Sequence, residues 1–588
     1  MFDALKIRAR TAVLRGSATA LNTLYQGMSG LRAGAVKDLA KTRPELYVKP
    51  SEAIASEAID NLVDFLQLTI RAITGETRPY EEVEIIIREG IEVGIFEDFG
   101  KVMYVKKSRV PDLLKNLKID EKKQDAFIEA GTEHTIFKES VFEGQRVARA
   151  QIKTRKVGKD RYKERDYIFP SREGLFNHMK RITHAEKVQA GDNRPDKLYL
   201  PGTACLPDFY DLNDEKSLAL EEAKASSWVY LLNSCGLGNK TERDRGSTVD
   251  TEISNLLPAA IDFLRAVSKG KQIILIGHSK GGFNALYMLV RQAYKLNNII
   301  NKISRGLNVE PYSVEGKTRK EIREQLDQYE QIITAQGNGH TFRACLEEAK
   351  EYLQRLDSVK GVQALGSPLA FDKNSHPIFP IFLNLNIILP LLMQDEVPVD
   401  LGKRLARMFP WAAKGARMLI NPANFDDPDA FLRELAEKGT DSFPLGVGFQ
   451  MLKAIYSGQG LRRMTKDKFE YPKYLHLIPI DIPIFMLYGD MDILAPTFNL
   501  GFIDPKYAEG SKIDLNRFST FRHKKKLVYE VASLEDVMGL DLKPRESQVI
   551  GIKIANINHL DFFYGKTGMR VVRPLMRRIN EVIWTSAA

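Results

Sequence analysis

Residues 273–282 read Ile-Ile-Leu-Ile-Gly-His-Ser-Lys-Gly-Gly, so that Ser279 lies between glycines at positions 277 and 281. Four aliphatic residues precede this Gly-x-Ser-x-Gly motif, and an apolar helical pattern follows it over 283–290. Glycines two before and two after the serine allow a strand and a helix to approach closely around a sharp turn. Such a turn exposes the hydroxyl, which predicts that Ser279 is a nucleophile. The alternative is a turn serine without reactivity.

A nucleophilic serine needs a general base and an acid that orients the base, and one known arrangement has the chain order serine, acid, histidine. Residues 482–488 form a buried-strand pattern that ends in Gly-Asp-Met-Asp, and Asp492 is a better candidate for the acid than Asp490. Residues 549–554 predict the last strand, and its exit loop carries His559. His559 is therefore the predicted base.

One other histidine follows the acid, namely His523. It lies beside Arg522 and ahead of three lysines at 524–526. Neighbouring positive charge disfavours its protonation, and the charged surroundings predict solvent exposure. His523 is thus expected to be a surface histidine.

These motifs resemble those of the serine α/β-hydrolase superfamily, in particular its ester-hydrolase and lipase branch. The resemblance rests on the serine turn, on the Gly-x-x-Asp-x-x-x-Pro sequence at 489–496 and on the His-Leu-Asp-Phe-x-x-Gly loop at 559–565, which is similar to that of acid lipases. It extends upstream to a hairpin over 164–183, a strand and loop over 197–203, a strand over 228–232 and a helix over 255–264. The implied fold class is α/β, with a mostly parallel central sheet flanked by helices.

The resemblance implies a role for each site residue. Ser279 attacks an ester carbonyl, His559 takes its proton, and Asp492 orients the imidazolium. The backbone N–H groups of Lys280 and Thr203 are the implied oxyanion hole. No metal and no organic cofactor is implied.

The side chain of Lys280 is expected to be solvated at the start of a helix, and the alternative is contact with an anionic head group of the substrate. Asp561 is expected to have a structural hydrogen-bonding role, as in the similar lipase loop.

The chain departs from the resembled pattern at two places. Pro201 stands where many relatives have histidine, and the sequence Asn-Ser-Cys-Gly at 233–236 stands where relatives often have aspartate. The histidine loop is also similar to that of polyhydroxyalkanoate synthases, but those enzymes have cysteine where this chain has Ser279. Three function classes stay open: hydrolysis of lipid or medium- to long-chain acyl esters, acyl transfer or polyester turnover, and a non-catalytic binding module.

Composition limits the class of protein. A length of 588 residues with 44% hydrophobic and 28% charged residues predicts a globular protein of two or more domains. Three cysteines, at 205, 235 and 345, have neither disulfide-framework nor metal-ligand spacing, which favours a cytoplasmic location. The net charge of +10 suggests an acidic partner surface, but the basic residues are scattered, so nucleic-acid binding is not expected.

Residues 1–150 are predicted to form an accessory region of mixed helix and strand, joined to the rest through the basic segment 153–165. Within it, residues 1–45 carry eight basic and three acidic side chains among apolar residues. This pattern is typical of a basic amphipathic helix on an anionic membrane surface. A transit peptide and a helix packed on the protein body are the alternatives. The oligomeric state stays open.

Insertions divide the predicted hydrolase core into residues 160–371 and 481–588. A helical insertion at about 300–358 contains charged helical patterns at 317–333 and 341–356, which predict an exposed hairpin. Residues 372–480 are a predicted lid. Its apolar run 377–393 contains prolines and lies between two strands of one sheet, so we expect it to cover the acyl chain of a substrate or to pack on itself, not to span a membrane. Further lid helices are predicted at 401–408, 428–438 and 447–456.

Overall fold

The computed structural model describes a defined part of the chain. The predicted arm 1–45, the rest of the accessory region to residue 148, the apolar run 377–393 and the predicted lid helix 401–408 lie outside the described residues. Those expectations therefore stay predictions. The described ranges are 149–170, 176–185, 194–225, 228–237, 247–267, 271–336, 339–371, 396–397, 417–457, 460–464, 469–509, 511, 513–518, 520–542 and 548–585.

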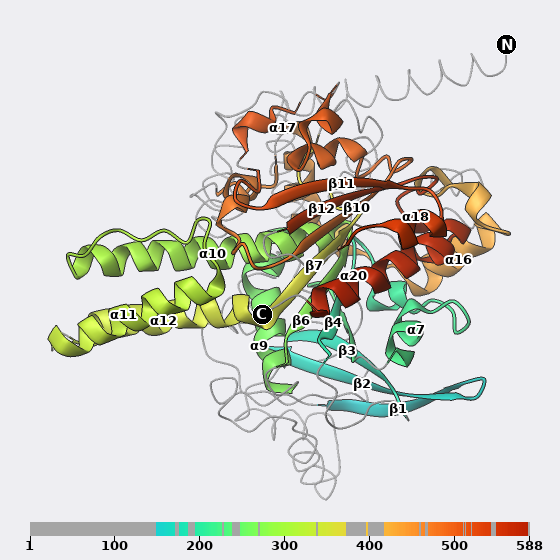
Figure 1. Ribbon diagram of the computed structural model, residues 1–588. Coiled ribbons are helices and arrows are strands. Elements are labelled where there is room, and N and C mark those ends of the chain that lie inside the picture. Colours follow the sequence, from blue (N-terminus) through green and yellow to red (C-terminus); the bar gives the residue numbers. More distant parts are fainter. Residues whose placement is uncertain are drawn as a thin grey trace, which may run out of the picture.

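A ten-stranded sheet lies at the centre of the described structure (Figure 1). In spatial order its strands are β1 (Arg149–Val157), β2 (Asp160–Pro170), β3 (Phe176–His184), β5 (Val229–Leu232), β4 (Asp196–Leu200), β6 (Ile273–His278), β7 (Val359–Leu365), β10 (Ile484–Gly489), β12 (Gln548–Ile554) and β11 (Lys525–Val531). The strands from β5 to β11 in this order pair in parallel, whereas β1, β2 and β3 form an antiparallel edge.

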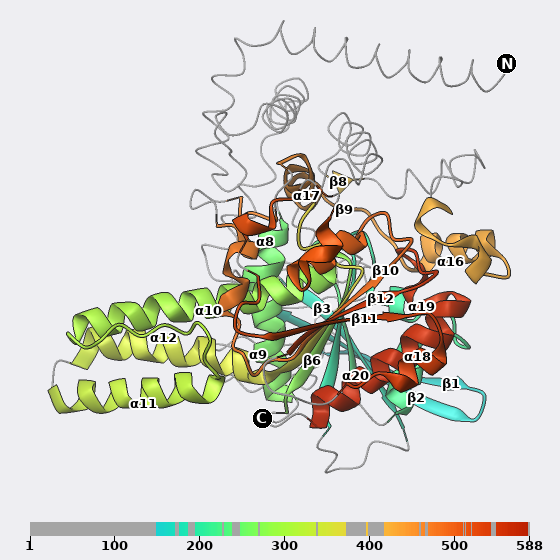
Figure 2. The same cartoon turned by 45° about the horizontal axis from the view of Figure 1, so that its top comes forward.

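Helices cover both faces of this sheet. Figure 2 shows α9 (Leu257–Val267) and α10 (Lys280–Gly306) on one side and α18 (Leu534–Gly539) and α20 (Arg573–Thr585) on the other. The remaining α-helices and the minor sheet are α7 (Leu218–Lys224), α8 (Val249–Thr251), α11 (Arg319–Gln336), α12 (Gly339–Ser358), α16 (Pro428–Lys438), α17 (Leu445–Ser457), α19 (Asp561–Tyr564), β8 (Glu396–Val397) and β9 (Phe443–Pro444). The predicted α/β class with a mostly parallel sheet flanked by helices is confirmed.

Strand β6 explains why the central strands read as continuous aliphatic runs. Its side chains alternate between two hydrophobic clusters: Ile273 and Leu275 pack on the side of α9 and α10, whereas Ile274 and Ile276 pack on the side of α7 and α20. Because both faces of the strand are covered, aliphatic residues are favoured at both alternate sets of positions. Packing on both faces therefore fixes the position of the end of β6, which Ser279 follows.

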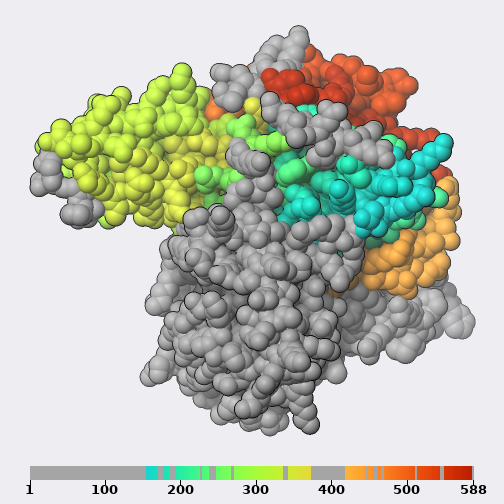
Figure 3. Space-filling model, turned by 90° about the horizontal axis from the view of Figure 1, so that it is seen from below, coloured from blue at the N-terminus to red at the C-terminus, as the bar shows by residue number. Residues whose placement is uncertain are grey.

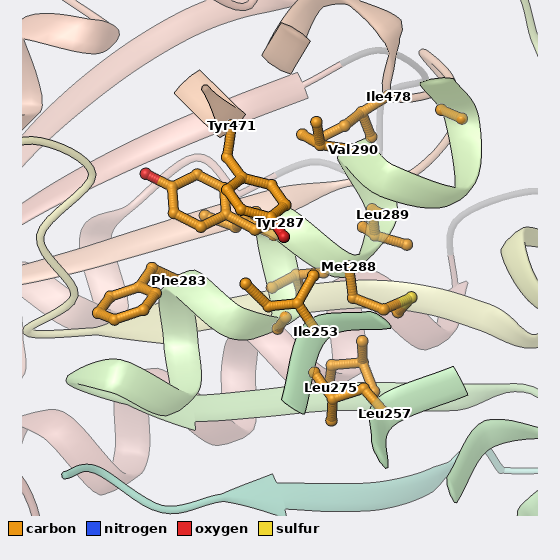
Figure 4. Packing of buried hydrophobic residues seen from close by; sticks show 14 of the residues in the cluster. Ile253, Leu257, Leu275, Phe283, Tyr287, Met288, Leu289, Val290, Tyr471 and Ile478 are labelled. Carbon is orange, nitrogen blue, oxygen red and sulfur yellow. The ribbon is translucent and has the colours of Figure 1, made fainter. Parts of the chain in front are cut away.

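The first turns of α10 are buried against residues of the insertion (Figure 4). The ring of Tyr287 stacks on that of Tyr471, with centroids 5.0 Å apart and planes inclined by 22°. The Tyr287 hydroxyl donates to the backbone oxygen of Leu369 at 2.7 Å. The predicted apolar helix after Ser279 is therefore confirmed, and it is longer than the pattern 283–290 indicated.

Helices α11 and α12 form the predicted hairpin and stand out from the body of the molecule (Figure 3). Arg355 of α12 fastens the hairpin to α9 by donating from Nε to Asp262 Oδ2 at 2.9 Å. In the insertion, α16 and α17 confirm the predicted helices 428–438 and 447–456. None of the helices within the described ranges combines the length and the apolar character needed to cross a bilayer.

Two charged segments differ from their predicted structure. Residues 153–165, expected to be a connecting segment, lie in β1 and β2 and extend the sheet. Strand β11 begins two residues after His523 and was not expected, because it starts with two lysines and its side chains are mostly exposed or partly exposed at the edge of the sheet. Lys524, the residue before this strand, is buried and donates from Nζ to the backbone oxygens of Pro479, Ile480 and Ile482 at 2.8, 3.0 and 2.7 Å.

Candidate active site

Ser279 lies in the turn between β6 and α10 with φ 53° and ψ −122°, a backbone conformation that side-chain-bearing residues rarely adopt. The flanking glycines are needed for this turn. A Cβ added to Gly277 lies 2.3 Å from the carbonyl carbon of Gly281, and one added to Gly281 lies 2.1 Å from the backbone oxygen of Leu200. The end of β6 thus lies too close to the start of α10 for a larger residue at 277, and the start of α10 lies too close to β4 for a larger residue at 281.

Asp492 and His559 form a buried pair. His559 Nδ1 lies 2.9 Å from Asp492 Oδ2 and 3.1 Å from Oδ1, and both residues are less than 5% exposed, at 4% and 3%. Asp492 Oδ1 also accepts hydrogen bonds from the backbone N–H groups of Leu494 at 2.9 Å and Ala495 at 2.8 Å. Burial alone raises the pKa of Asp492, but His559 and these amides outweigh burial and hold the pKa below its ordinary value. Asp492 is therefore a carboxylate at neutral pH.

The parallel sheet brings the three residues to one edge. Ser279 follows β6, Asp492 follows β10, and His559 follows β12, and the carboxyl ends of parallel strands meet on the same side. Gly366, after β7, lies between them: a Cβ there is 3.0 Å from Asp492 Oδ2 and 3.5 Å from His559 Nδ1. The ring of residue 278, next to Ser279, lies 4.8 Å from that of His559.

The loop after β4 lies against the serine turn. A Cβ added to Gly202 is 3.2 Å from Ser279 Cβ, so the backbone at 202–203 closely approaches the nucleophile. The insertion holds this loop in place, because the N–H of Asp441 donates to Ala204 O at 3.0 Å and Thr203 Oγ1 donates to Met451 Sδ at 3.2 Å. Lys280 begins α10, where the first N–H groups have no carbonyl partner within the helix. Lys280 thus follows Ser279 directly, and Thr203 follows the glycine that lies against it, while the oxyanion role of their N–H groups stays a prediction.

The side chain of Lys280 corrects an expectation. It is 1% exposed instead of solvated, and its Nζ contacts both carboxylate oxygens of Glu252 and donates to Ser234 Oγ at 3.0 Å. Glu252 also accepts from Asn284 Nδ2 at 2.6 Å. The close packing of α10 on the π-helical turn Glu252–Leu256 buries the ammonium group, so it does not face a substrate head group.

Other sequence-predicted residues lie as follows. His523 is a surface histidine, as predicted, and its Nε2 lies 2.9 Å from Glu315 Oε1. The three cysteines at 205, 235 and 345 are buried in the described structure. Burial raises the pKa of Cys205 to about 12, so this thiol is not a nucleophile at neutral pH.

Asp561 has the hydrogen-bonding role expected for it. It accepts from the backbone N–H groups of Asn421 at 2.9 Å and Asn558 at 3.1 Å, and from Asn424 Nδ2 at 2.9 Å. The N–H of Leu560 also donates to the backbone oxygen of Leu419 at 2.9 Å. Residues of the insertion therefore hold the loop that carries His559, which sequence reasoning did not anticipate.

We predict that Asp561→Asn destabilises the protein by about 1–3 kcal/mol, because an amide nitrogen, which cannot accept, then faces the Asn421 N–H that donates to both carboxylate oxygens. Burial raises the pKa of Asp561 to about 6, above its ordinary value of 3.8, so the folded state binds more protons than the unfolded state between these values. The stabilisation of the folded state by protonation of Asp561 is therefore complete below pH 3.8 and is lost as the pH rises through about 6. Urea unfolding at several pH values measures both effects.

The matched control for this prediction is Asp426→Asn, which removes an exposed carboxylate that pairs with Lys566 at 2.8 Å. We expect it to leave the free energy of unfolding nearly unchanged, since exposed ion pairs contribute little. Equal stability of Asp561→Asn and the wild type contradicts the role assigned to Asp561.

A scan against protein-family models found no match, and neither did a search of curated proteins. Solved structures similar to this chain include an esterase from Thermogutta terrifontis, with 12% identity, 74% of this chain and 99% of that chain covered, and a TM-score of 0.33. A monoacylglycerol lipase from Paleococcus ferrophilus has 15% identity, 67% and 96% coverage and a TM-score of 0.30. An epoxide hydrolase from Vigna radiata has 12% identity, 73% and 98% coverage and a TM-score of 0.33. At these identities and TM-scores, a proposal about the reaction has to come from the residues of this chain itself.

Proposed function

We propose that the protein is a serine hydrolase that cleaves carboxylic esters through Ser279, His559 and Asp492. The observation that carries this proposal is the buried His559–Asp492 pair at the same sheet edge as a serine in a strained strand-to-helix turn. Strain of this kind persists only where the surrounding structure imposes it, and it is concentrated at functional sites. A binding module needs neither the strained serine nor the buried pair.

The mechanism follows from the roles of these groups. Asp492 holds Nδ1 of His559, so the other ring nitrogen, Nε2, takes the proton of Ser279 as its Oγ attacks the ester carbonyl carbon. The N–H groups of Lys280 and Thr203 donate to the oxyanion, and each such donor contributes about 3 kcal/mol in the transition state. The imidazolium then gives its proton to the departing alcohol. Water, activated by His559, attacks the acyl-enzyme and releases the acid and Ser279.

We further propose that the acyl group is of medium or long chain. Two features of helix α17 support a medium or long acyl chain. Most of its described side chains are buried and apolar, and its Met451 contacts Thr203 of the oxyanion loop. Each methylene of an acyl chain that moves from water into an apolar environment contributes about 0.8 kcal/mol. An acyl chain bound along α17 therefore increases the binding energy with its length.

The first test is labelling with a fluorophosphonate probe, followed by a series of p-nitrophenyl esters from acetyl to octanoyl. We expect labelling of Ser279 and an increase in kcat/KM with chain length. Labelling of another residue contradicts the proposed nucleophile, and a strict preference for acetyl esters contradicts the proposed substrate class.

The side of the site that binds the acyl chain is tested by Met451→Gln, which we expect to flatten the increase with chain length. Its matched control is Met538→Gln, which changes an exposed methionine on α18. Addition of alcohol acceptors to the same assay distinguishes hydrolysis from acyl transfer, since an acyltransferase forms a new ester faster than the free acid.

A further inference from the structure

His278 is the last residue of β6 and the neighbour of Ser279. It is 1% exposed, and its Nε2 lies 2.7 Å from the backbone oxygen of His559. A carbonyl oxygen only accepts hydrogen bonds, so Nε2 carries the proton in this contact. Nδ1 has no hydrogen-bond partner among the described residues and faces the glycine of the oxyanion loop, where a Cβ on Gly202 lies 3.4 Å away.

The surroundings of the His278 ring keep it in one orientation and one charge state. It stacks on Phe209, with centroids 5.2 Å apart and planes at 26°, and meets the edges of Phe562 and Phe563 at 5.9 and 5.6 Å. Burial, then the charge of His559, lowers the pKa of His278 to about 3, although Asp492 acts in the opposite direction. The ring is therefore a neutral donor throughout the pH range of an esterase assay.

We propose that His278 is a positioning residue that sets the distance between the nucleophile and the general base. The inference rests on the proposed catalytic roles of Ser279 and His559. His278 Nε2–H ties the backbone of the base to the strand that immediately precedes the nucleophile, across 281 positions of sequence.

This tie adds a constraint that the acid does not supply. Asp492 hydrogen-bonds to the ring of His559, at Nδ1, whereas His278 hydrogen-bonds to its backbone oxygen. The two contacts together fix both ends of the His559 residue. A misplacement of about 1 Å between reacting groups costs on the order of 100-fold in rate, so the loss of one contact is measurable even if the protein stays folded.

The test compares two amide substitutions that differ in where they place an N–H donor. The amide nitrogen of His278→Gln reaches about the position of Nε2 and can donate to His559 O, whereas that of His278→Asn reaches only about the position of Nδ1. We expect His278→Asn to lower kcat by about 10- to 100-fold with little change in KM. His278→Gln is expected to retain kcat within a few-fold of the wild type.

Rates are expressed per Ser279 titrated with the fluorophosphonate, so that loss of folded protein in either variant does not enter the comparison. If both variants are as active as the wild type, the inference is overturned. An equal loss of activity in both variants also overturns it, because the hydrogen bond donated to His559 O is then not the cause of the loss. A loss in the Gln variant alone also overturns it, since Nδ1 is then the important atom. Failure of the proposed function itself is distinguishable, because Ser279→Ala then retains hydrolysis.

Discussion

Ser279→Ala is expected to lower kcat/KM for ester hydrolysis by roughly 10⁴-fold or more, since no other group replaces the attacking oxygen. His559→Ala and Asp492→Asn are expected to cause losses of similar kind, because proton transfer needs the base in one tautomer and orientation. The three groups act as one unit, so the losses do not add in double variants. Steady-state kinetics of single and double variants, with thermal melts to verify folding, measure this.

Asp490→Asn is the matched control for the acid. Asp490 lies two residues before Asp492 but is exposed, whereas Asp492 is buried against His559. We expect the Asp490 variant to keep activity close to that of the wild type. Full activity of Asp492→Asn together with an inactive Asp490→Asn would show that the acid is misassigned, and retained activity in Ser279→Ala would exclude the nucleophile.

The second large effect concerns stability. Lys280→Met is expected to lower the free energy of unfolding by about 3–5 kcal/mol, because it leaves the buried carboxylate of Glu252 without its cation. The double variant Lys280→Met/Glu252→Gln is expected to recover most of this loss, since the neutral amide keeps hydrogen-bonding capacity without a buried charge. Urea unfolding of the two single variants and the double variant measures the coupling between the two residues.

Lys317→Met serves as the control for this cycle, since Lys317 forms an exposed pair with Glu321, with side-chain exposures of 41% and 45%. An exposed pair contributes at most about 1 kcal/mol. The assignment of Lys280 is contradicted if its variant is no less stable than the Lys317 variant, or if the double variant is less stable than either single one.

Sequence alone was sufficient where structure depends on neighbours in the chain. The strand, turn and helix around Ser279 can be predicted from nearby residues alone. An aliphatic run indicates a strand buried on both faces, and glycines indicate a turn that admits no Cβ. The patterns 482–488 and 549–554 likewise match β10 (Ile484–Gly489) and β12 (Gln548–Ile554) to within two residues. The order of strands and exit loops was therefore enough to nominate Asp492 and His559.

The strands rich in charged residues were not predicted from the sequence, and there is a physical reason for this. Residues 153–165 have the composition of a solvated segment, and residues 525–531 alternate apolar residues with lysines and a glutamate after further basic residues, yet these segments form β11 and most of β1 and β2. At the edges of a sheet, the backbone pairing that stabilises a strand comes from its neighbour strand, and the outer side chains can remain in water. Such pairing is a property of the assembled sheet, and no local pattern reports it.

The contacts of Lys280 and His278 were decided by the tertiary structure alone. A lysine at a helix start is solvated by default, and only the packing of α10 on Glu252, 28 positions away, buries its charge with a partner. His278 meets the backbone of His559 only because parallel strands bring distant loops to one edge. The sequence determined which residues can react, since reactivity depends on residue type and local backbone. The tertiary structure decided which side chains hold these reactive residues in place, because such contacts form only when segments distant in the sequence pack against one another and are buried from water.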